Sequence, residues 1–299
     1  MKIFFLTVLL FGMILADTAT LEDSLFDETL SLKKEAISNI QRKEQYFDAY
    51  LNEYTDNETR NTVFQIASSI FDINPYKSNY LLPITYDFIT HENRQNAEVA
   101  FQISFQKDMA YNLFGLKETI GIAYTQRSWW QLYKHSSPFR ETNYLPEAYM
   151  SIPWHNNKSP IKRYKFGFLH ESNGQPEGNS RSWNRLYMDI TLQYKGVFVN
   201  PRIWYRIPEH DDDNKEILDY MGYGDLTIIY PYKEHLFKLL LRNNFDFEDN
   251  KGAVQLDWTF PFAKSGVFGY IQYFDGYGES LIDYNKKARR IGMGFALSR

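Results

Sequence analysis

Two residues of this sequence, His170 and Ser172, are of the types that carry out covalent catalysis, and they stand two positions apart. A serine hydroxyl becomes a nucleophile when a base takes its proton, and a neutral imidazole can be that base. Asn184 follows twelve residues after Ser172 and could orient the imidazole, as the third member of such triads does. Gly174 would let backbone N–H groups approach a developing oxyanion. Together these four residues predict ester hydrolysis.

The residue types alone leave other interpretations open. His135 and Ser137 have the same spacing, so the pair is not specific by itself. A histidine and a serine near a membrane surface can also be interfacial polar residues without catalytic work. The sequence contains no Gly-x-Ser-x-Gly motif, which gives no support to the common soluble hydrolase fold.

The three candidate side chains lie on segments in which apolar residues recur at every second position. In a strand, residues i and i+2 point to the same face. His170 and Ser172 therefore continue the face of Phe166 and Phe168, and Asn184 shares the parity of the apolar residues that follow it. The pattern places His170, Ser172 and Asn184 on one apolar face, beside the long loop 173–182.

About twelve alternating segments run from Tyr80 to the end of the chain. The tight turns expected between them are Lys195-Gly196, Lys233–His235 and Ala263–Gly266, and the longer loops are 132–142, 173–182, 209–221 and 279–288. An even number of strands with short turns alternating with long loops is typical of outer-membrane barrels. Polar residues on the second face would pair with one another inside a barrel. The sequence thus predicts an all-β fold, a 12-stranded antiparallel transmembrane β-barrel with a short helical or irregular N-terminal lead.

Composition excludes several classes of function. The chain has no cysteine, so it forms neither disulfides nor thiolate metal sites. A net charge of −4 argues against a nucleic-acid partner. The 23 Tyr, 23 Phe and six Trp residues suit strands and the aromatic girdles of a membrane barrel, and we expect Trp129 and Trp130 in such a girdle.

The first residues read as an export signal. Lys2 precedes the apolar segment Ile3 to Leu15, and Ala16 suits the last position before cleavage. We therefore expect a signal peptide at 1–16, a periplasmic lead at 17–76 and a barrel at 77–299. No later run of about 18 apolar residues occurs, which excludes a helical membrane protein.

Longer motifs resemble the outer-membrane phospholipase A family from about Asn79 to the C-terminus. They are YTQRSWWQL (124–132), SSPFRETNY (136–144), HESNG (170–174), SRSWNRLY (180–187), YMGYGDL (220–226) and GYGESLIDYN (276–285). The resemblance implies a twelve-stranded outer-membrane barrel with a Ser-His-Asn triad on its outer surface. It implies hydrolysis of the acyl esters of phospholipids and lysophospholipids, a requirement for calcium, and activity as a homodimer. In this chain the implied roles are Ser172 as nucleophile, His170 as base, Asn184 as orienting residue and Gly174 at the oxyanion site.

The resemblance also implies a calcium site. Ser180 matches the hydroxyl ligand, and Gln175, where the family usually has arginine, would supply a backbone carbonyl. Ser136 of the partner subunit would supply another carbonyl, and Glu177 stands where aspartate is frequent. Oxygen ligands suit calcium rather than zinc. Gln126 matches a glutamine that lies near the dimer interface in the family.

Two further classes remain as alternatives. A non-enzymatic barrel such as a small porin would give no reason for the candidate triad to share the lipid-facing side. A soluble β-sandwich that binds a ligand would show the same alternation. The acidic run at 209–213, EHDDD, is interpreted as a solvated loop rather than a metal site.

Overall fold

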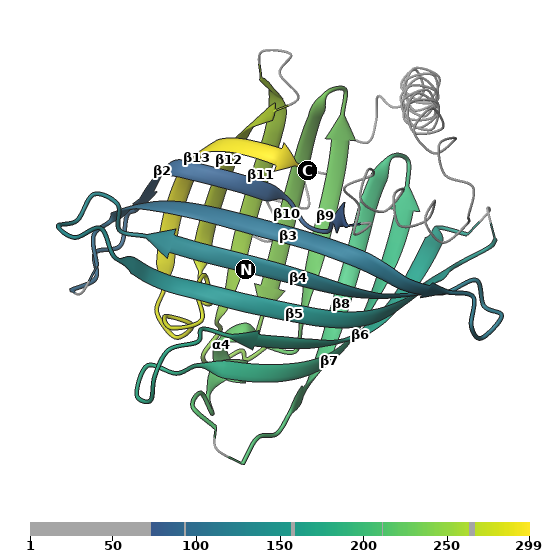
Figure 1. Cartoon of the computed structure of the whole chain (residues 1–299), viewed down its shortest axis with the longest axis horizontal. Helices are drawn as coiled ribbons and strands as arrows, with labels where there is room; N and C mark the ends of the chain where they lie inside the picture. Colours follow the sequence, from purple (N-terminus) through teal and green to yellow (C-terminus); the bar gives the residue numbers. More distant parts are fainter. Residues whose placement is uncertain (1–72, 93, 157–158, 211, 263–266) are drawn as a thin grey trace, which may run out of the picture. The chain divides into compact units, whose positions relative to one another are not determined.

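The computed structural model describes residues 73–92, 94–156, 159–210, 212–262 and 267–299. In these ranges one antiparallel sheet closes on itself, because β2 pairs with β13 on one side and with β3 on the other (Figure 1). The closed ring contains twelve strands, β2 to β13, which confirms the predicted barrel. No helix within the described ranges is long and apolar enough to cross a membrane.

The strands of the ring are β2 (Asn79–Asp87), β3 (Ala97–Tyr111), β4 (Thr119–Trp130), β5 (Phe139–Pro153), β6 (Ile161–Ser172), β7 (Ser182–Tyr194), β8 (Val197–Ile207), β9 (Gly224–Tyr232), β10 (His235–Asn243), β11 (Gly252–Phe262), β12 (Val267–Gly276) and β13 (Ala288–Ser298). A two-residue strand, β1 (Asn74–Pro75), also pairs with β3 and falls within the predicted lead. The predicted signal peptide and the lead up to residue 72 lie outside the described residues.

The connections differ between the two ends of the barrel. At one end, β7 and β8 are joined by Lys195 and Gly196, both with positive φ (44° and 77°), as a tight hairpin turn of matching twist requires. At the other end the connections are longer, and the one between β8 and β9 contains a short helix, α4 (Ile217–Met221). The predicted long loops beside β6 and after β12 both belong to this second end.

Alternation along the strands separates an apolar wall from a polar interior. On β6, Phe166 and Phe168 are each 40% exposed, whereas Lys165 before them and Glu171 after them are buried. Large apolar residues are exposed on the outer wall of most other strands as well. An apolar surface of this extent is stable against lipid rather than water, as expected for a barrel that spans a membrane.

Trp129 departs from the sequence-based expectation. It is 5% exposed and packs inside the barrel with Leu82 and Tyr270, so its place in an aromatic girdle was predicted wrongly. The Arg140 guanidinium lies 5.6 Å from its ring centroid, a cation–π contact. Its neighbour Trp130 points the other way and stacks on Phe139, with ring centroids 5.4 Å apart. Alternation forces the two tryptophans to opposite sides.

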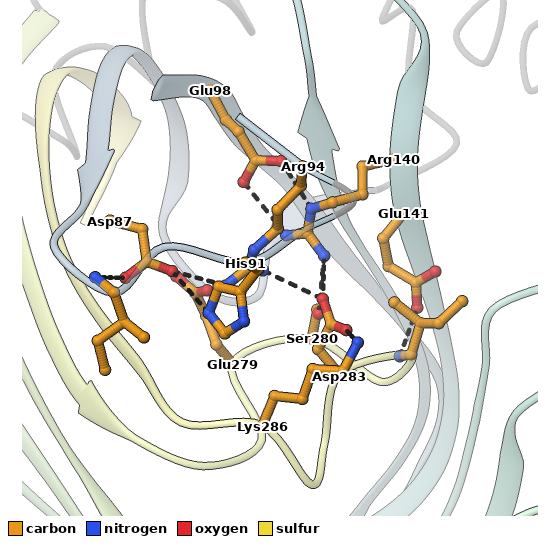
Figure 2. Close-up of polar contacts among 12 residues, drawn as sticks. Asp87, His91, Arg94, Glu98, Arg140, Glu141, Glu279, Ser280, Asp283 and Lys286 are labelled. Atoms are coloured by element: carbon orange, nitrogen blue, oxygen red, sulfur yellow. Dashed lines mark hydrogen bonds and ion pairs between the residues drawn. The ribbon is translucent and has the colours of Figure 1, made fainter. Parts of the chain in front are cut away.

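Charged side chains fill the interior beside the loop 277–287, and Figure 2 shows several of them, including Arg94, Arg140 and Asp283. We name as the interior ion cluster the residues Asp87, Arg94, Glu98, Arg140, Glu279, Asp283 and Arg290. Three arginines thus face four carboxylates, and the exposed Lys286 adds an ion pair to Asp283 at 2.9 Å. Arg140 joins Glu98 at 2.6 Å and Asp283 at 2.8 Å, and so ties two strands to the loop. Buried charges persist only when paired in this way.

The other two arginines extend these links around the barrel. Arg94 bonds to Asp87 at 2.6 Å and to Asp283 at 3.1 Å. Arg290 bonds to Glu98 at 2.9 Å and to Glu279 at 2.6 Å. The loop 277–287 is thereby held against the inner wall by carboxylates at two of its positions.

Apolar side chains fill the interior next to the same loop. Trp183 and Ile217 are 0% exposed, and Leu281 is 2% exposed in the same cluster. Trp183 and Trp204 meet edge to face at 6.2 Å. An interior occupied by tryptophans, a helix and a loop is unlike the water-filled channel of a porin, so the porin alternative loses support.

Asp283→Asn should destabilise the barrel near neutral pH. Burial raises the pKa of Asp283, but the Arg140 guanidinium and the Lys286 ammonium outweigh it and hold the pKa below its usual value. A carboxyl with a depressed folded-state pKa stabilises above its unfolded pKa, and this stabilisation is lost as the pH falls through the folded value. We expect a loss of about 3 kcal/mol at pH 7.

Urea unfolding in detergent micelles at several pH values measures this effect. The difference between wild type and Asp283→Asn should shrink as the pH falls below about 4, which is the ordinary range of an aspartate. Asp213→Asn, which removes an exposed loop carboxyl, serves as the control and should change little. A difference that stays the same from pH 7 to pH 3 would show that the charge of Asp283 is not what stabilises the fold.

Candidate active site

The pairing of β6 with β7 brings His170 and Asn184 together. The two residues are direct cross-strand partners in the antiparallel ladder. The His170 Nδ1 atom lies 2.9 Å from the Asn184 Oδ1 atom, within hydrogen-bond distance. The hairpin therefore places side by side two residues that are fourteen positions apart in the chain, both on the outward-facing parity of their strands.

A third residue fixes which way the Asn184 amide points. The Asn184 Nδ2 atom donates to the Glu209 Oε1 atom at 2.8 Å. A carboxylate only accepts hydrogen bonds, so the amide nitrogen must face Glu209 and the amide oxygen must face His170. The imidazole then donates from Nδ1, and its Nε2 atom keeps a free lone pair. This is the tautomer that a general base needs.

Ser172 follows His170 on the same outward face and is half-buried. Its cross-strand neighbours are Ser182 on β7 and Tyr144 on β5. No hydrogen bond joins the Ser172 hydroxyl to the His170 ring within the described residues. Catalytic hydrogen bonds are often long before substrate binds and tighten in the complex, so the shared face is the relevant observation.

Buried Glu171 fixes the strand between the two candidate catalytic residues. Its carboxylate lies inside the barrel, 2% exposed, and accepts from Arg185 at 2.6 Å and Arg127 at 2.8 Å. The Trp183 indole nitrogen donates to it at 3.0 Å. Because Glu171 is locked inward, His170 and Ser172 on either side are forced outward.

Two pockets open near these residues. One, of about 370 Å³, is lined by Tyr144, Gly174 and Gln175, among others. The second, of about 470 Å³, has almost wholly apolar walls and reaches from Phe105 across β4 and β5 to Phe168 and His170. Its walls come from the lipid-facing side. An apolar groove that ends at an imidazole suits a lipid chain that carries an ester.

Gly174 begins the loop between β6 and β7 with a φ of +62°, a left-handed backbone that glycine adopts readily. Asn173, next to it, is 2% exposed and accepts from the Arg181 backbone N–H at 2.9 Å. The Asn173 side chain also donates to the Asn179 carbonyl at 2.8 Å. These two bonds close the loop on itself and set the path of Gly174.

The residues predicted to bind a metal fall on two loops. Gln175, Glu177 and Ser180 all belong to the loop after β6, whereas Ser136 belongs to the loop after β4 and has a φ of +65°. Within the described part of the chain, no three His, Asp or Glu side chains gather into a metal-binding group. A donor set of backbone carbonyls, one hydroxyl and one carboxylate is all oxygen, and this chemistry fits calcium.

Sequence reasoning missed Glu209. It begins the acidic run that we interpreted as a solvated loop, yet its side chain turns to Asn184. Strand parity carries the signal that identifies it: Ile207 pairs with Asn184 and faces outward, and Glu209 lies two residues further on. The sequence reveals the parity of β8, but it does not reveal the register between β7 and β8 that brings Glu209 next to Asn184.

A closed membrane-spanning barrel with polar residues of hydrolytic type on its lipid-facing wall defines an outer-membrane enzyme. A family model described as Phospholipase A1 matches residues 51–297. The phospholipase A1 of Proteus vulgaris is 37% identical over 242 residues, covering 76% of this chain and 82% of that protein. The phospholipase A1 of Escherichia coli K12 is 35% identical over 245 residues, with the same coverage.

Solved structures agree with the sequence relatives. Outer membrane phospholipase A from Escherichia coli superposes with a TM-score of 0.70 at 34% identity, covering 76% of this chain and 92% of that one. The calcium-bound dimer of the Salmonella typhi outer membrane phospholipase matches equally well, with 93% of its chain covered. The chain belongs to the phospholipase A1 family, and it is a phospholipase of the outer membrane.

Gly174→Ala should impair hydrolysis through the position of the loop. A left-handed backbone costs a non-glycine residue about 1 kcal/mol. An added Cβ would also lie 3.1 Å from the Tyr144 ring, a close contact that the ring or the loop must relieve. We expect kcat for phospholipid hydrolysis to fall about tenfold, since a displaced oxyanion donor commonly costs that or more.

Gly178→Ala is the matched control for this variant. Gly178 lies in the same loop with a φ of +90°, but a Cβ there meets nothing within 4 Å. Gly178→Ala should therefore have the same energetic cost of a left-handed backbone, but kcat measured on the same phospholipid substrate should fall little. Equal losses in both variants would mean that general loop strain, and not the place of Gly174, controls the rate.

Proposed function

We propose that this phospholipase cleaves acyl esters of phospholipids and lysophospholipids with Ser172 as nucleophile, His170 as general base and Asn184 as the residue that orients the base. The observation that carries the proposal is the hydrogen bond between His170 Nδ1 and Asn184 Oδ1 on the lipid-facing wall. It leaves Nε2 free on the face that also presents Ser172. The proposed scope includes both phospholipase A1 and phospholipase A2 activity.

The reaction follows from these positions. His170 Nε2 takes the Ser172 proton while the hydroxyl oxygen attacks the ester carbonyl carbon, and a tetrahedral oxyanion forms beside the backbone of Gly174. The intermediate collapses, the bond to the glycerol oxygen breaks, and His170 returns the proton to that leaving oxygen. Water then attacks the acyl-serine and loses its proton to His170. The bond to Ser172 Oγ breaks, His170 returns the proton to that oxygen, and a fatty acid is released.

Calcium would be held by the Gln175 carbonyl, the Ser180 hydroxyl and the Glu177 carboxylate, together with the carbonyl of Ser136 of the partner subunit. When bound, the ion supplies positive charge close to the developing oxyanion. Support comes from the all-oxygen donor set of the loop after β6 and from the calcium-bound Salmonella typhi relative. Export by cleavage of residues 1–16 would deliver the chain to the outer membrane.

Ser172→Ala and His170→Ala should each lower kcat at least 1000-fold, since loss of a triad nucleophile or base removes covalent catalysis. Hydrolysis is measured as fatty-acid release from mixed micelles of phospholipid and detergent. Ser151→Ala, on β5 outside the site, controls for changes to a barrel serine. Calcium chelation of wild-type enzyme should stop turnover, and added calcium should restore it. Full activity in Ser172→Ala would refute the mechanism.

The same proposal includes a homodimer formed through the wall that carries Gln126. Gln126 faces outward, and its side chain bonds along its own strand, to Tyr124 at 3.1 Å and Ser128 at 3.3 Å. A polar side chain on a lipid-facing wall gains from a partner's hydrogen bonds. The dimer would also bring Ser136 of the partner subunit to the calcium site.

Because the chain has no cysteine, Gln126→Cys tests the dimer on a clean background. Mild oxidation in the presence of calcium should give a disulfide-linked dimer, since Cα atoms must approach within about 7 Å to be bridged. Leu256→Cys, on the outer wall of β11, should stay monomeric under the same conditions. Failure of Gln126→Cys to cross-link while activity is retained would place the interface elsewhere.

A further inference from the structure

Glu209 lies directly behind the residue that orients the base. Its Oε1 atom accepts from Asn184 Nδ2 at 2.8 Å, and its Oε2 atom lies 3.5 Å from the Ser182 hydroxyl. A line of hydrogen bonds thus runs from the imidazole through the amide to a carboxylate. None of the sequence motifs pointed to this third link.

Hydrogen bonds to neighbouring residues hold the loop that carries Glu209. Arg206 bonds to Asp212 at 2.6 Å, and the same carboxylate accepts the Asn214 backbone N–H at 3.0 Å. The buried Asn214 side chain in turn accepts the Ser182 backbone N–H at 3.2 Å. The loop is therefore anchored to β7 two residues before Asn184, which holds Glu209 in register with the amide.

We propose that Glu209 is a positioning residue for the hydrolytic site, one that completes a His170–Asn184–Glu209 relay; this rests on the proposed function of His170 and Ser172. An amide can turn over and present its nitrogen to the imidazole, which would leave the base in the wrong tautomer. The Glu209 carboxylate prevents this because it can only accept. Asn184 then orients the histidine as aspartate does in other triads, and the Glu209 carboxylate behind it supplies the negative charge.

The charge has a second effect. When His170 becomes an imidazolium during attack, a hydrogen-bonded carboxylate polarises the intervening amide and strengthens its acceptor oxygen. The half-buried position of Glu209, beside a lipid-facing wall, screens this interaction less than open water would. The relay therefore both fixes the geometry of the base and favours its charged form.

Steady-state kinetics of Glu209→Ala and Glu209→Gln test the relay in the folded, calcium-loaded enzyme. Glu209→Ala should lower kcat about tenfold with KM unchanged within twofold. Glu209→Gln should recover only part of this loss, because its Oε1 atom can accept the same hydrogen bond, but its amide can also donate and carries no charge. Glu216→Gln, which removes an exposed carboxyl from the same loop, should behave as wild type. Heat-modifiable gel mobility checks that each variant is folded.

A double-mutant cycle with Asn184→Ala separates positioning from general loop structure. If Glu209 acts through the amide, Glu209→Ala should change kcat by less than twofold once Asn184 is absent. An equal tenfold loss in both backgrounds, or wild-type kcat in Glu209→Ala, would overturn the relay. Ser172→Ala measured alongside keeps the two proposals apart: an active Ser172→Ala refutes the mechanism itself, whereas an inactive one with unimpaired Glu209→Ala refutes only the relay.

Discussion

The rest of the structure depends on the closure of one antiparallel sheet inside a membrane. Hydrocarbon offers no partner to a backbone N–H or C=O group, so every strand must be paired on both sides. The pairing of β2 with β13 satisfies that demand. Closure then divides each strand into an inner and an outer parity, and this division determines the place of every side chain. Charges such as Glu98 and Arg290 go inward and pair, while phenylalanines go outward.

The same constraint explains why the candidate base and the two residues behind it bond to one another within one subunit. A polar group on a lipid-facing wall lacks water on one side, so its hydrogen bonds must come from neighbouring side chains. His170, Asn184 and Glu209 meet this requirement among themselves through bonds of 2.9 and 2.8 Å. The same contacts therefore supply the hydrogen bonds that these polar groups need and orient the His170 ring. In a water-exposed site, water could supply the hydrogen bonds, and the ring would need separate contacts to orient it.

Strand parity made much of this structure readable from the sequence. The period of two places His170, Ser172 and Asn184 on one face, and the turn at Lys195-Gly196 is visible in the residue types. The sequence could not reveal features that depend on register across strands. The error at Trp129 has another cause. Tryptophan favours membrane interfaces, so Trp129 was expected in the girdle, but its strand parity points inward, where two arginines contact its ring. Parity applied without regard to residue type would have corrected that error.

Glu209 was missed for a related reason. Charge runs in long loops are usually solvated, and strand parity alone does not show that the first acid of EHDDD reaches the site. Only the pairing of Ile207 with Asn184 shows that the outward face of β8 continues to the site. The proposed calcium ligands are hard to recognise in the sequence for a different reason. Any residue has a backbone carbonyl, so residue type does not identify such a ligand, and Ser136 lies on a separate loop.

The interior and the lipid-facing site are joined through one buried side chain, Glu141. It accepts the Ile282 backbone N–H at 3.0 Å and lies 3.5 Å from the Asn173 amide nitrogen. Asn173 closes the loop that contains Gly174. The path from the loop 277–287 to the oxyanion position is thus two side chains long. Ion pairs that fill the barrel therefore also provide the rigid base on which a site facing fluid lipid can keep its geometry.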